Sequence, residues 1–153
     1  MIRIAAAMMM VAAGATRLSA QDPIAGKWSM DYPTAIRSEN GEETVVSSRK
    51  ATFDFTMRGD SIAGTWTLAP DSTGTAPKPL AVHGVRTGTS YTIETEPVDR
   101  HIVMNGDDHT IRMATKYTFE VHGEQLAGAS TLFAVDGSMD MPSRLFVAAR
   151  EKP

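Results

Sequence analysis

The chain has 153 residues, contains no cysteine and carries a formal net charge of −3 at pH 7. The lack of cysteine excludes disulfides, thiol catalysis, thiolate metal sites and lipid attachment at an N-terminal cysteine. The acidic balance argues against a nucleic-acid partner and an anionic membrane surface, because both ask for a basic face.

The N-terminus has the pattern of a secretory signal peptide. Arg3 gives a positive start, an apolar run covers residues 4–13, and Ala20 is the small residue before the expected cut. The apolar run is too short to span a bilayer, and no later stretch approaches the length that spanning requires, so we expect no membrane insertion. We therefore expect a signal peptide at 1–20 and one domain at 21–153, exported to the periplasm or the extracellular space and not lipid-anchored. The alternative is an ordinary N-terminal helix.

Short alternating segments, separated by turn signals, follow along the rest of the chain. Pro33 is expected to stop the first strand, and Asn40-Gly41 and Asn105-Gly106 are strong hairpin-turn sequences. Residues 69–79 contain three prolines and have no hydrophobic period, so they predict a loop. The strands are expected at residues 24–32, 44–46, 52–58, 62–68, 80–86, 91–95, 101–104, 111–122, 126–132 and 144–150.

Two stretches of the chain resemble each other and predict two equivalent hairpins. Residues 52–68 and 116–132 each contain an alternating strand, a turn with glycine before an acidic residue, and a second strand. Side chains on a strand alternate between two faces, so Phe53, Phe55 and Met57 share the face that should be buried. A lone hairpin is only marginally stable in water, so the two copies need a common core.

These segments predict an all-β fold without a helix after the signal peptide. Consecutive hairpins with few long connections favour a single antiparallel up-and-down β-barrel of about eight to ten strands. Closing the sheet into a barrel also removes its exposed edges. Gly64 and Gly128 fall in the middle of strands, where a glycine often marks a bend, a bulge or a close packing contact.

The ends of the domain resemble the signature of the calycin superfamily, which covers lipocalins, fatty-acid-binding proteins and avidins. The resemblance lies in Gly26-Lys27-Trp28 on the first strand and Arg150 at the end of the last. It implies that Trp28 and Arg150 are structural residues that stack and close the base of the barrel. The hairpins with Leu/Ile-Ala-Gly also look like those of small exported bacterial proteins of no assigned activity. The resemblance carries over no particular ligand.

We recognise no catalytic constellation in the sequence. Residues 59–61 (Gly-Asp-Ser) resemble the nucleophile motif of GDS-type esterases, but the equivalent turn of the second hairpin has Gln125 where the first has Ser61. Ser61 is therefore better explained as a turn residue. Residues 107–109 (Asp-Asp-His) could hold a metal, but they follow a turn sequence, and a solvated turn is the better interpretation. We expect no enzyme activity, no metal and no cofactor.

The apolar faces carry the remaining functional hypothesis. Where the first hairpin has Trp66, the second has the small Ser130, which leaves room for a small apolar ligand in the barrel, unless Trp66 fills the space. We expect an exported, non-enzymatic binding protein. The alternative is a structural or protein-interaction module with a packed core, whose protein partner the sequence does not identify. The residues expected to line the ligand are Phe55, Met57, Trp66, Met104, Met113, Tyr117, Phe119 and Ser130.

Overall fold

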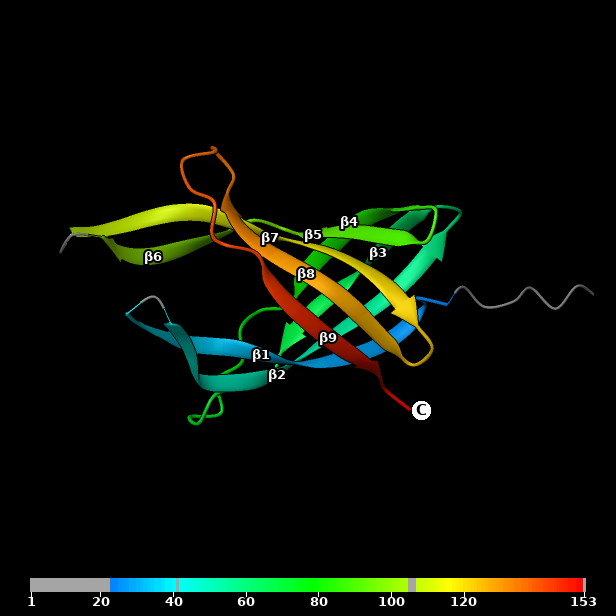
Figure 1. Ribbon diagram of the computed structural model, residues 1–153, viewed down its shortest axis with the longest axis horizontal. Coiled ribbons are helices and arrows are strands. Elements are labelled where there is room, and N and C mark those ends of the chain that lie inside the picture. The colour runs from blue at the N-terminus through cyan, green and yellow to red at the C-terminus, as the bar shows by residue number, and fades with distance from the viewer. Residues whose placement is uncertain (1–22, 41, 105–106, 153) are drawn as a thin grey trace, which may run out of the picture.

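A computed structural model describes residues 23–40, 42–104 and 107–152. The signal peptide expected at 1–20 lies outside the described residues. Within these ranges the chain forms nine antiparallel strands and no helix (Figure 1). The strands are β1 (Gly26–Glu39), β2 (Glu42–Arg58), β3 (Ser61–Leu68), β4 (Leu80–Thr87), β5 (Ser90–Thr95), β6 (Val98–Met104), β7 (Asp107–His122), β8 (Gln125–Ala134) and β9 (Arg144–Arg150).

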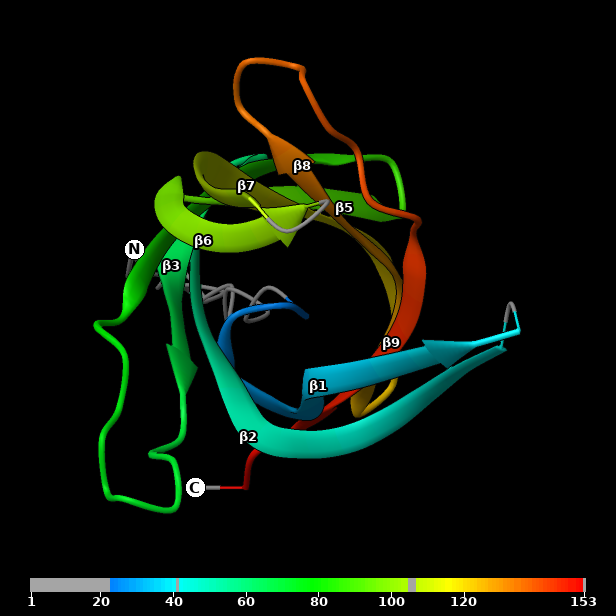
Figure 2. The ribbon, with the colours of Figure 1, turned by 90° about the vertical axis from the view of Figure 1, so that its left-hand side faces the viewer.

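Eight of these strands close into a barrel (Figure 2). β1 pairs with β2, β2 with β3, β3 with β4, and β4 with β5. β5 then pairs with β7, and the ring continues through β8 and β9 back to β1. All of these pairings are antiparallel, and the strands follow chain order around the wall. The predicted all-β, up-and-down, closed barrel is therefore confirmed.

The ninth strand, β6, continues the line of β5. Both strands pair with β7, β5 with its residues 116–120 and β6 with its residues 107–113. Pro97 interrupts the line between them because proline has no N–H to donate. At this break the hydroxyl of Thr95 accepts a hydrogen bond from the N–H of Thr115 at 3.0 Å. Beyond the break, β6 and the first half of β7 form a ribbon that projects from one end of the barrel (Figure 1).

Aromatic side chains fill the interior. Phe53, Phe55, Phe119 and Tyr91 make successive ring contacts, with centroids 5.1, 6.1 and 5.6 Å apart. Phe55 and Phe119 are only 1% and 2% exposed, as the alternation predicts. Burial of each large apolar side chain stabilises the fold by about 1.5–3 kcal/mol, so this cluster contributes strongly to the stability of the barrel.

Trp28 and Arg150 close one end of the barrel, which we call the base. Trp28 is fully buried, and its Nε1 donates a hydrogen bond to the carbonyl of Ile24 at 2.7 Å. The guanidinium carbon of Arg150 lies 4.1 Å from the Trp28 ring centroid, the contact that the calycin resemblance implies. Arg150 also donates to the carbonyl oxygens of Ala25, at 2.8 Å, and of Pro23. The last strand is thereby tied to the segment that leads into the first.

Two glycines allow neighbouring strands to approach closely. Gly64 and Gly128 each pair across the ladder with a buried phenylalanine. A Cβ added to Gly64 would lie 2.1 Å from the carbonyl oxygen of Asp54, and one added to Gly128 would lie 2.0 Å from that of Thr118. Both positions are therefore close packing contacts, one of the roles predicted for them.

Away from the base, β1 separates from β9. In the described residues the two strands pair only through Trp28 and Ser29 of β1. The N–H of Glu151 bonds to the carbonyl of Lys27, so alternate residues of β1 from Lys27 onward turn their backbone groups toward β9. Pro33 is one of these residues and has no N–H, so the ladder cannot continue there.

The expectation that Pro33 stops the first strand was therefore wrong. β1 runs past Pro33 to Glu39 beside β2, with register shifts next to Pro33 and Ala35. The pairing with β9 ends earlier, at Ser29, so Pro33 lies on an edge that faces no paired strand, where a missing donor is tolerated. The far halves of β1 and β2 consequently form a second ribbon that leaves the wall (Figure 2).

Candidate ligand-binding site

Two cavities lie at the end of the barrel opposite the base. The first, the seam cavity, has a volume of about 360 Å³ and lies where β1 separates from β9; its lining includes Met30, Tyr32, Tyr117, Ser130, Arg144 and Phe146. The second, the junction cavity, has about 540 Å³ and lies beside the break between β5 and β6; its lining includes Tyr32, Arg49, Trp66, Lys78, Glu96 and Arg100. Both volumes fall in the range typical of small-molecule sites.

Tyr32 lies between the two cavities and lines both. It packs edge-on against Trp66, with the ring centroids 5.2 Å apart and the ring planes at 74°. Pro33 is the other residue shared by the two linings. Both residues follow the point at which β1 stops pairing with β9, so the seam cavity and Tyr32 lie where the two strands have separated.

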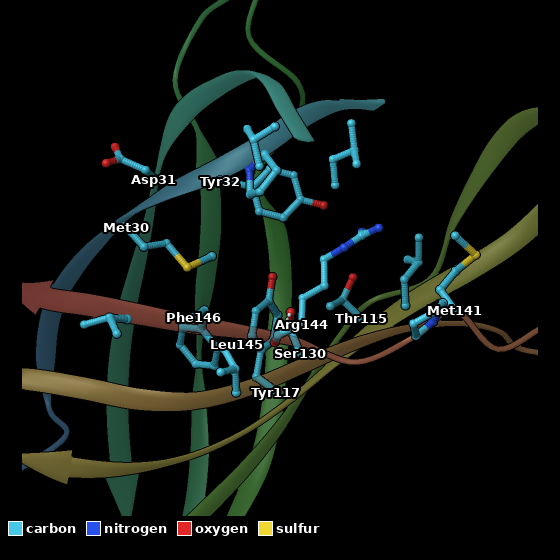
Figure 3. Close-up of a pocket in the computed structure, with 16 residues that line it drawn as sticks. Met30, Asp31, Tyr32, Thr115, Tyr117, Ser130, Met141, Arg144, Leu145 and Phe146 are labelled. Carbon is cyan, nitrogen blue, oxygen red and sulfur yellow. Dashed lines mark hydrogen bonds between the residues drawn. The ribbon is translucent and has the colours of Figure 1, made fainter. Parts of the chain in front are cut away.

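The seam cavity has an apolar part toward the base. Met30 and Phe146 lie at this end of the cavity, and Tyr117 lies beside Phe146 with ring centroids 5.3 Å apart (Figure 3). Burial raises the pKa of the Tyr117 hydroxyl; nearby Tyr32 adds to the rise and Arg100 opposes it. Tyr117 therefore stays neutral at physiological pH and can offer a hydrogen bond without a charge.

The other part of the seam cavity is polar. Figure 3 shows the side chains of Thr115, Ser130 and Arg144 extending into the space below Tyr32. The hydroxyl of Ser130 donates a hydrogen bond to the backbone carbonyl of Arg144 at 3.4 Å. An apolar floor with a few polar groups on one side is the usual lining of a site for a small organic molecule.

The junction cavity combines aromatic, aliphatic and charged lining. Trp66 is 6% exposed, and its Nε1 is buried without a hydrogen-bond partner. The Nε of Arg100 is also buried without a partner. The carboxylate of Glu96 accepts the N–H of Ala81 at 3.2 Å, and Arg49 donates to the carbonyl of Ala69 at 3.1 Å. Two buried donors in the lining of one cavity thus remain unsatisfied.

Three of the eight residues expected to line a ligand lie in the two cavities. Trp66 lines the junction cavity, and Tyr117 and Ser130 line the seam cavity. The contrast between Trp66 and Ser130 pointed to free space near Ser130, and the seam cavity lies there. The cavities therefore bring these three residues to the same end of the barrel.

Most of the other expected lining residues lie elsewhere. Phe55 and Phe119 are buried in the core cluster, whereas Met113 is buried where β7 pairs with β6, and none of the three is part of either lining. Met57 is half-buried and packs against the core cluster. Met104 ends β6, and its side chain lies outside what the structure describes. The interior near the base is thus filled by side chains, whereas the space lies toward the mouth.

Tyr32 and Arg100 are two of the lining residues that sequence reasoning missed. Each stands close to a proline, Tyr32 directly before Pro33 and Arg100 three residues after Pro97. Prolines inside strand-like segments mark the points where a ladder must break, and a broken ladder is where a barrel wall can open. That signal was present in the sequence, although it does not say which side chains line the opening.

The candidate catalytic and metal positions do not form a site with their neighbours. Residues 107–109 are exposed at the start of β7, and Ser61 is exposed at the start of β3. Among the described residues there is no group of three or more His, Asp or Glu side chains placed to hold a metal ion. The described ranges also hold no helix with the length and hydropathy that crossing a lipid bilayer takes.

Comparison of the chain with protein-family models, with curated proteins and with solved structures finds no match in any of the three. The chemistry of a ligand must therefore be argued from the cavities themselves. Their shared features are aromatic lining, a position at the barrel mouth, and polar groups on one side.

Proposed function

We propose that this protein is a calycin-like carrier that binds a small, largely apolar molecule at the open end of its barrel. The observation that carries the proposal is the pair of cavities of about 360 and 540 Å³ that meet at Tyr32, above an interior otherwise filled by side chains. The signal-peptide pattern at 1–20 supports a carrier that works in the periplasm or outside the cell, free of a lipid anchor.

The lining favours binding over catalysis. Histidine is the side chain most often used as a general acid or base, and all four histidines of the chain are exposed and lie outside both cavities. Asp31 is the one carboxylate in the seam lining, and the two in the junction lining have other partners, since Glu96 accepts the N–H of Ala81 and Asp99 pairs with Arg112. Met30, Tyr32 and Trp66 instead supply adaptable and flat apolar surface, which suits a carrier.

The proposal is tested with phenylnaphthylamine, a neutral apolar fluorophore, added to the protein comprising residues 21–153. We expect saturable binding of one fluorophore per chain with a strong increase in its emission. Ser130→Leu fills the seam cavity and distinguishes the two cavities: weaker binding would locate the neutral fluorophore in the seam cavity, and unchanged binding would locate it in the junction cavity. The matched control is Ala129→Leu, because Ala129 is the neighbouring residue on the opposite face of β8. If the unsubstituted protein binds neither this fluorophore nor its sulfonated analogue, the carrier proposal is removed.

A second candidate function, protein interaction by strand addition, is favoured by the open edge of β9. Leu145 and Val147 alternate with the residues bonded to β8, so their backbone groups face the gap to β1. Their side chains are 90% and 56% exposed. An exposed strand edge with apolar side chains can accept a strand from another polypeptide.

Strand addition makes a different prediction from the carrier proposal. An extended peptide of alternating valine and threonine should bind the protein, and Leu145→Pro should abolish binding because it removes the N–H that faces the gap. Leu145→Ala keeps that N–H and should keep binding. If the peptide does not bind, or if both variants behave alike, the edge is not a strand-addition site.

A further inference from the structure

Trp66 has a buried hydrogen-bond donor that nothing in the described chain satisfies. Its Nε1 has no partner, although the ring is almost completely buried. A buried tryptophan usually finds a partner for its N–H, because an unsatisfied donor away from water destabilises the folded state. Trp28 follows the rule, since its Nε1 bonds to the carbonyl of Ile24. The tryptophan whose N–H lacks a partner therefore lines the junction cavity, whereas the tryptophan at the base has its partner.

Arg100, a cationic side chain, also has a buried donor without a hydrogen-bond partner. It is half-buried on the inward side of β6, and its Nε has no partner. Within the described ranges Arg100 forms no ion pair, whereas Arg112 on the outer side of the same ribbon pairs with Asp99 at 3.7 Å. Removing a cation from water without an opposite charge is unfavourable, so Arg100 lacks the partner that its position calls for.

The other charges of the junction cavity do not supply that partner. Asp99 is engaged with Arg112, and Glu96 accepts the N–H of Ala81. Arg49 and Lys78 add positive charge to the lining. The cavity therefore has three cationic side chains, while both of its carboxylates have other partners. A bound anion would supply the negative charge that the cationic side chains of the junction cavity lack.

We propose that the ligand of this carrier is an amphiphile with an anionic oxygen group, such as a carboxylate or a sulfonate, bound in the junction cavity. The inference rests on the proposed carrier function and specifies its ligand. Arg100 and Trp66 donate to the anionic group, and the ligand's apolar body lies along the aromatic and aliphatic part of the lining. That part consists of Tyr32, Trp66, Leu68, Pro77, Leu80 and Val98.

Binding in this way requires a small side-chain movement. The two donor atoms are closed to water in the structure, so the anionic group reaches them only when a neighbouring side chain shifts. Tyr32 packs edge-on against Trp66 and lines both cavities, so we expect the Tyr32 ring to be the side chain that shifts, toward the seam cavity.

Two fluorophores with the same apolar body test the inference. Anilinonaphthalene sulfonate carries a sulfonate on the ring system of phenylnaphthylamine, which is neutral. We expect the protein to bind the sulfonate about tenfold more tightly than the neutral compound, since a charge-assisted contact to Arg100 is made only by the former. Arg100→Gln should remove most of this preference, because it removes the half-buried cation while Trp66, Arg49 and Lys78 remain. Trp66→Phe keeps a ring but removes the donor, and should reduce it in part.

The matched control is Arg112→Gln, which removes a cation from the outer face of the same ribbon and should leave the preference unchanged. Thermal unfolding shows whether each variant is folded, and Arg100→Lys, which keeps a cation, should keep most of the preference. Equal binding of the two fluorophores, or a preference that Arg100→Gln leaves undiminished, overturns the inference and leaves the carrier function standing. If neither fluorophore binds, the carrier function itself fails.

Discussion

Gly128→Ala is expected to be among the most damaging single-methyl changes in the barrel. The added Cβ would lie 2.0 Å from the carbonyl oxygen of Thr118 on the neighbouring strand, where separations under 3.0 Å are essentially never seen. Because the obstructing atom belongs to the backbone, no rotamer change can relieve the contact. β7 and β8 must instead separate by about 1 Å at the pair that holds Phe119 in the core.

The cost follows from overpacking in a rigid wall. Inserting a methyl group into a well-packed core typically costs 1–3 kcal/mol, and a clash with backbone places this change at the upper end, at about 3 kcal/mol. A domain of this size is stable by about 5–15 kcal/mol, so the variant should still fold. The measurement is urea unfolding followed by tryptophan fluorescence, with the free energy extrapolated to water.

Gly88→Ala is the matched control. Gly88 lies in the turn between β4 and β5 with a φ of +63°, and nothing lies within 4 Å of an added Cβ. Its cost is the strain of a left-handed residue, about 1 kcal/mol after the lower entropy of the unfolded chain is included. The change in unfolded-state entropy is the same for both variants and cancels in the comparison. Equal losses for the two variants would refute the close approach of β7 and β8.

Three further predictions concern charges. Arg100→Met should stabilise the ligand-free protein by about 1 kcal/mol in thermal unfolding, because it removes a half-buried cation without an ion pair in the described chain; a loss of stability would contradict this. Arg150→Met should destabilise the protein by about 3 kcal/mol and shift the emission of Trp28 to the red, since stacking and hydrogen bonds at the base are lost together. Unchanged emission would contradict the contact between Arg150 and Trp28. Hydrogen bonding, chiefly from the Thr73 hydroxyl, holds the pKa of Asp71 below its ordinary value of 3.8. The loop between β3 and β4 should therefore stay ordered above pH 3.8 and lose its order as the pH falls through the lowered pKa of Asp71. Limited proteolysis across that range measures the effect, and cleavage that does not increase on acidification would refute it.

Much of the barrel could be predicted because its signals are local. Period-two alternation in residues 52–58 and 111–122 fixes which side chains face inward, and glycine before an acidic residue fixes the turns. The stacking of Trp28 and Arg150 followed from a resemblance that joins the two ends of the domain. Neither the local patterns nor the resemblance requires the arrangement of strands far apart in the chain to be known beforehand.

The position of the empty space could not be predicted in the same way. Alternation shows that Phe55 and Phe119 face inward, but it does not show whether their rings fill the interior or line a cavity. That depends on where the wall opens, which is between β1 and β9 beyond Ser29 and beside Pro97 before β6. A proline inside a strand can end the strand or end one of its two pairings, and only the arrangement of all the strands decides between these outcomes.

The most direct test of the carrier proposal is a crystal structure of residues 21–153 with phenylnaphthylamine. We predict density for the ring system at the barrel mouth, in contact with Tyr32 and enclosed by the seam or the junction cavity. Density for the compound on the outer wall alone, or in a cavity made by displacing Phe55 and Phe119 from the core, would contradict the proposal.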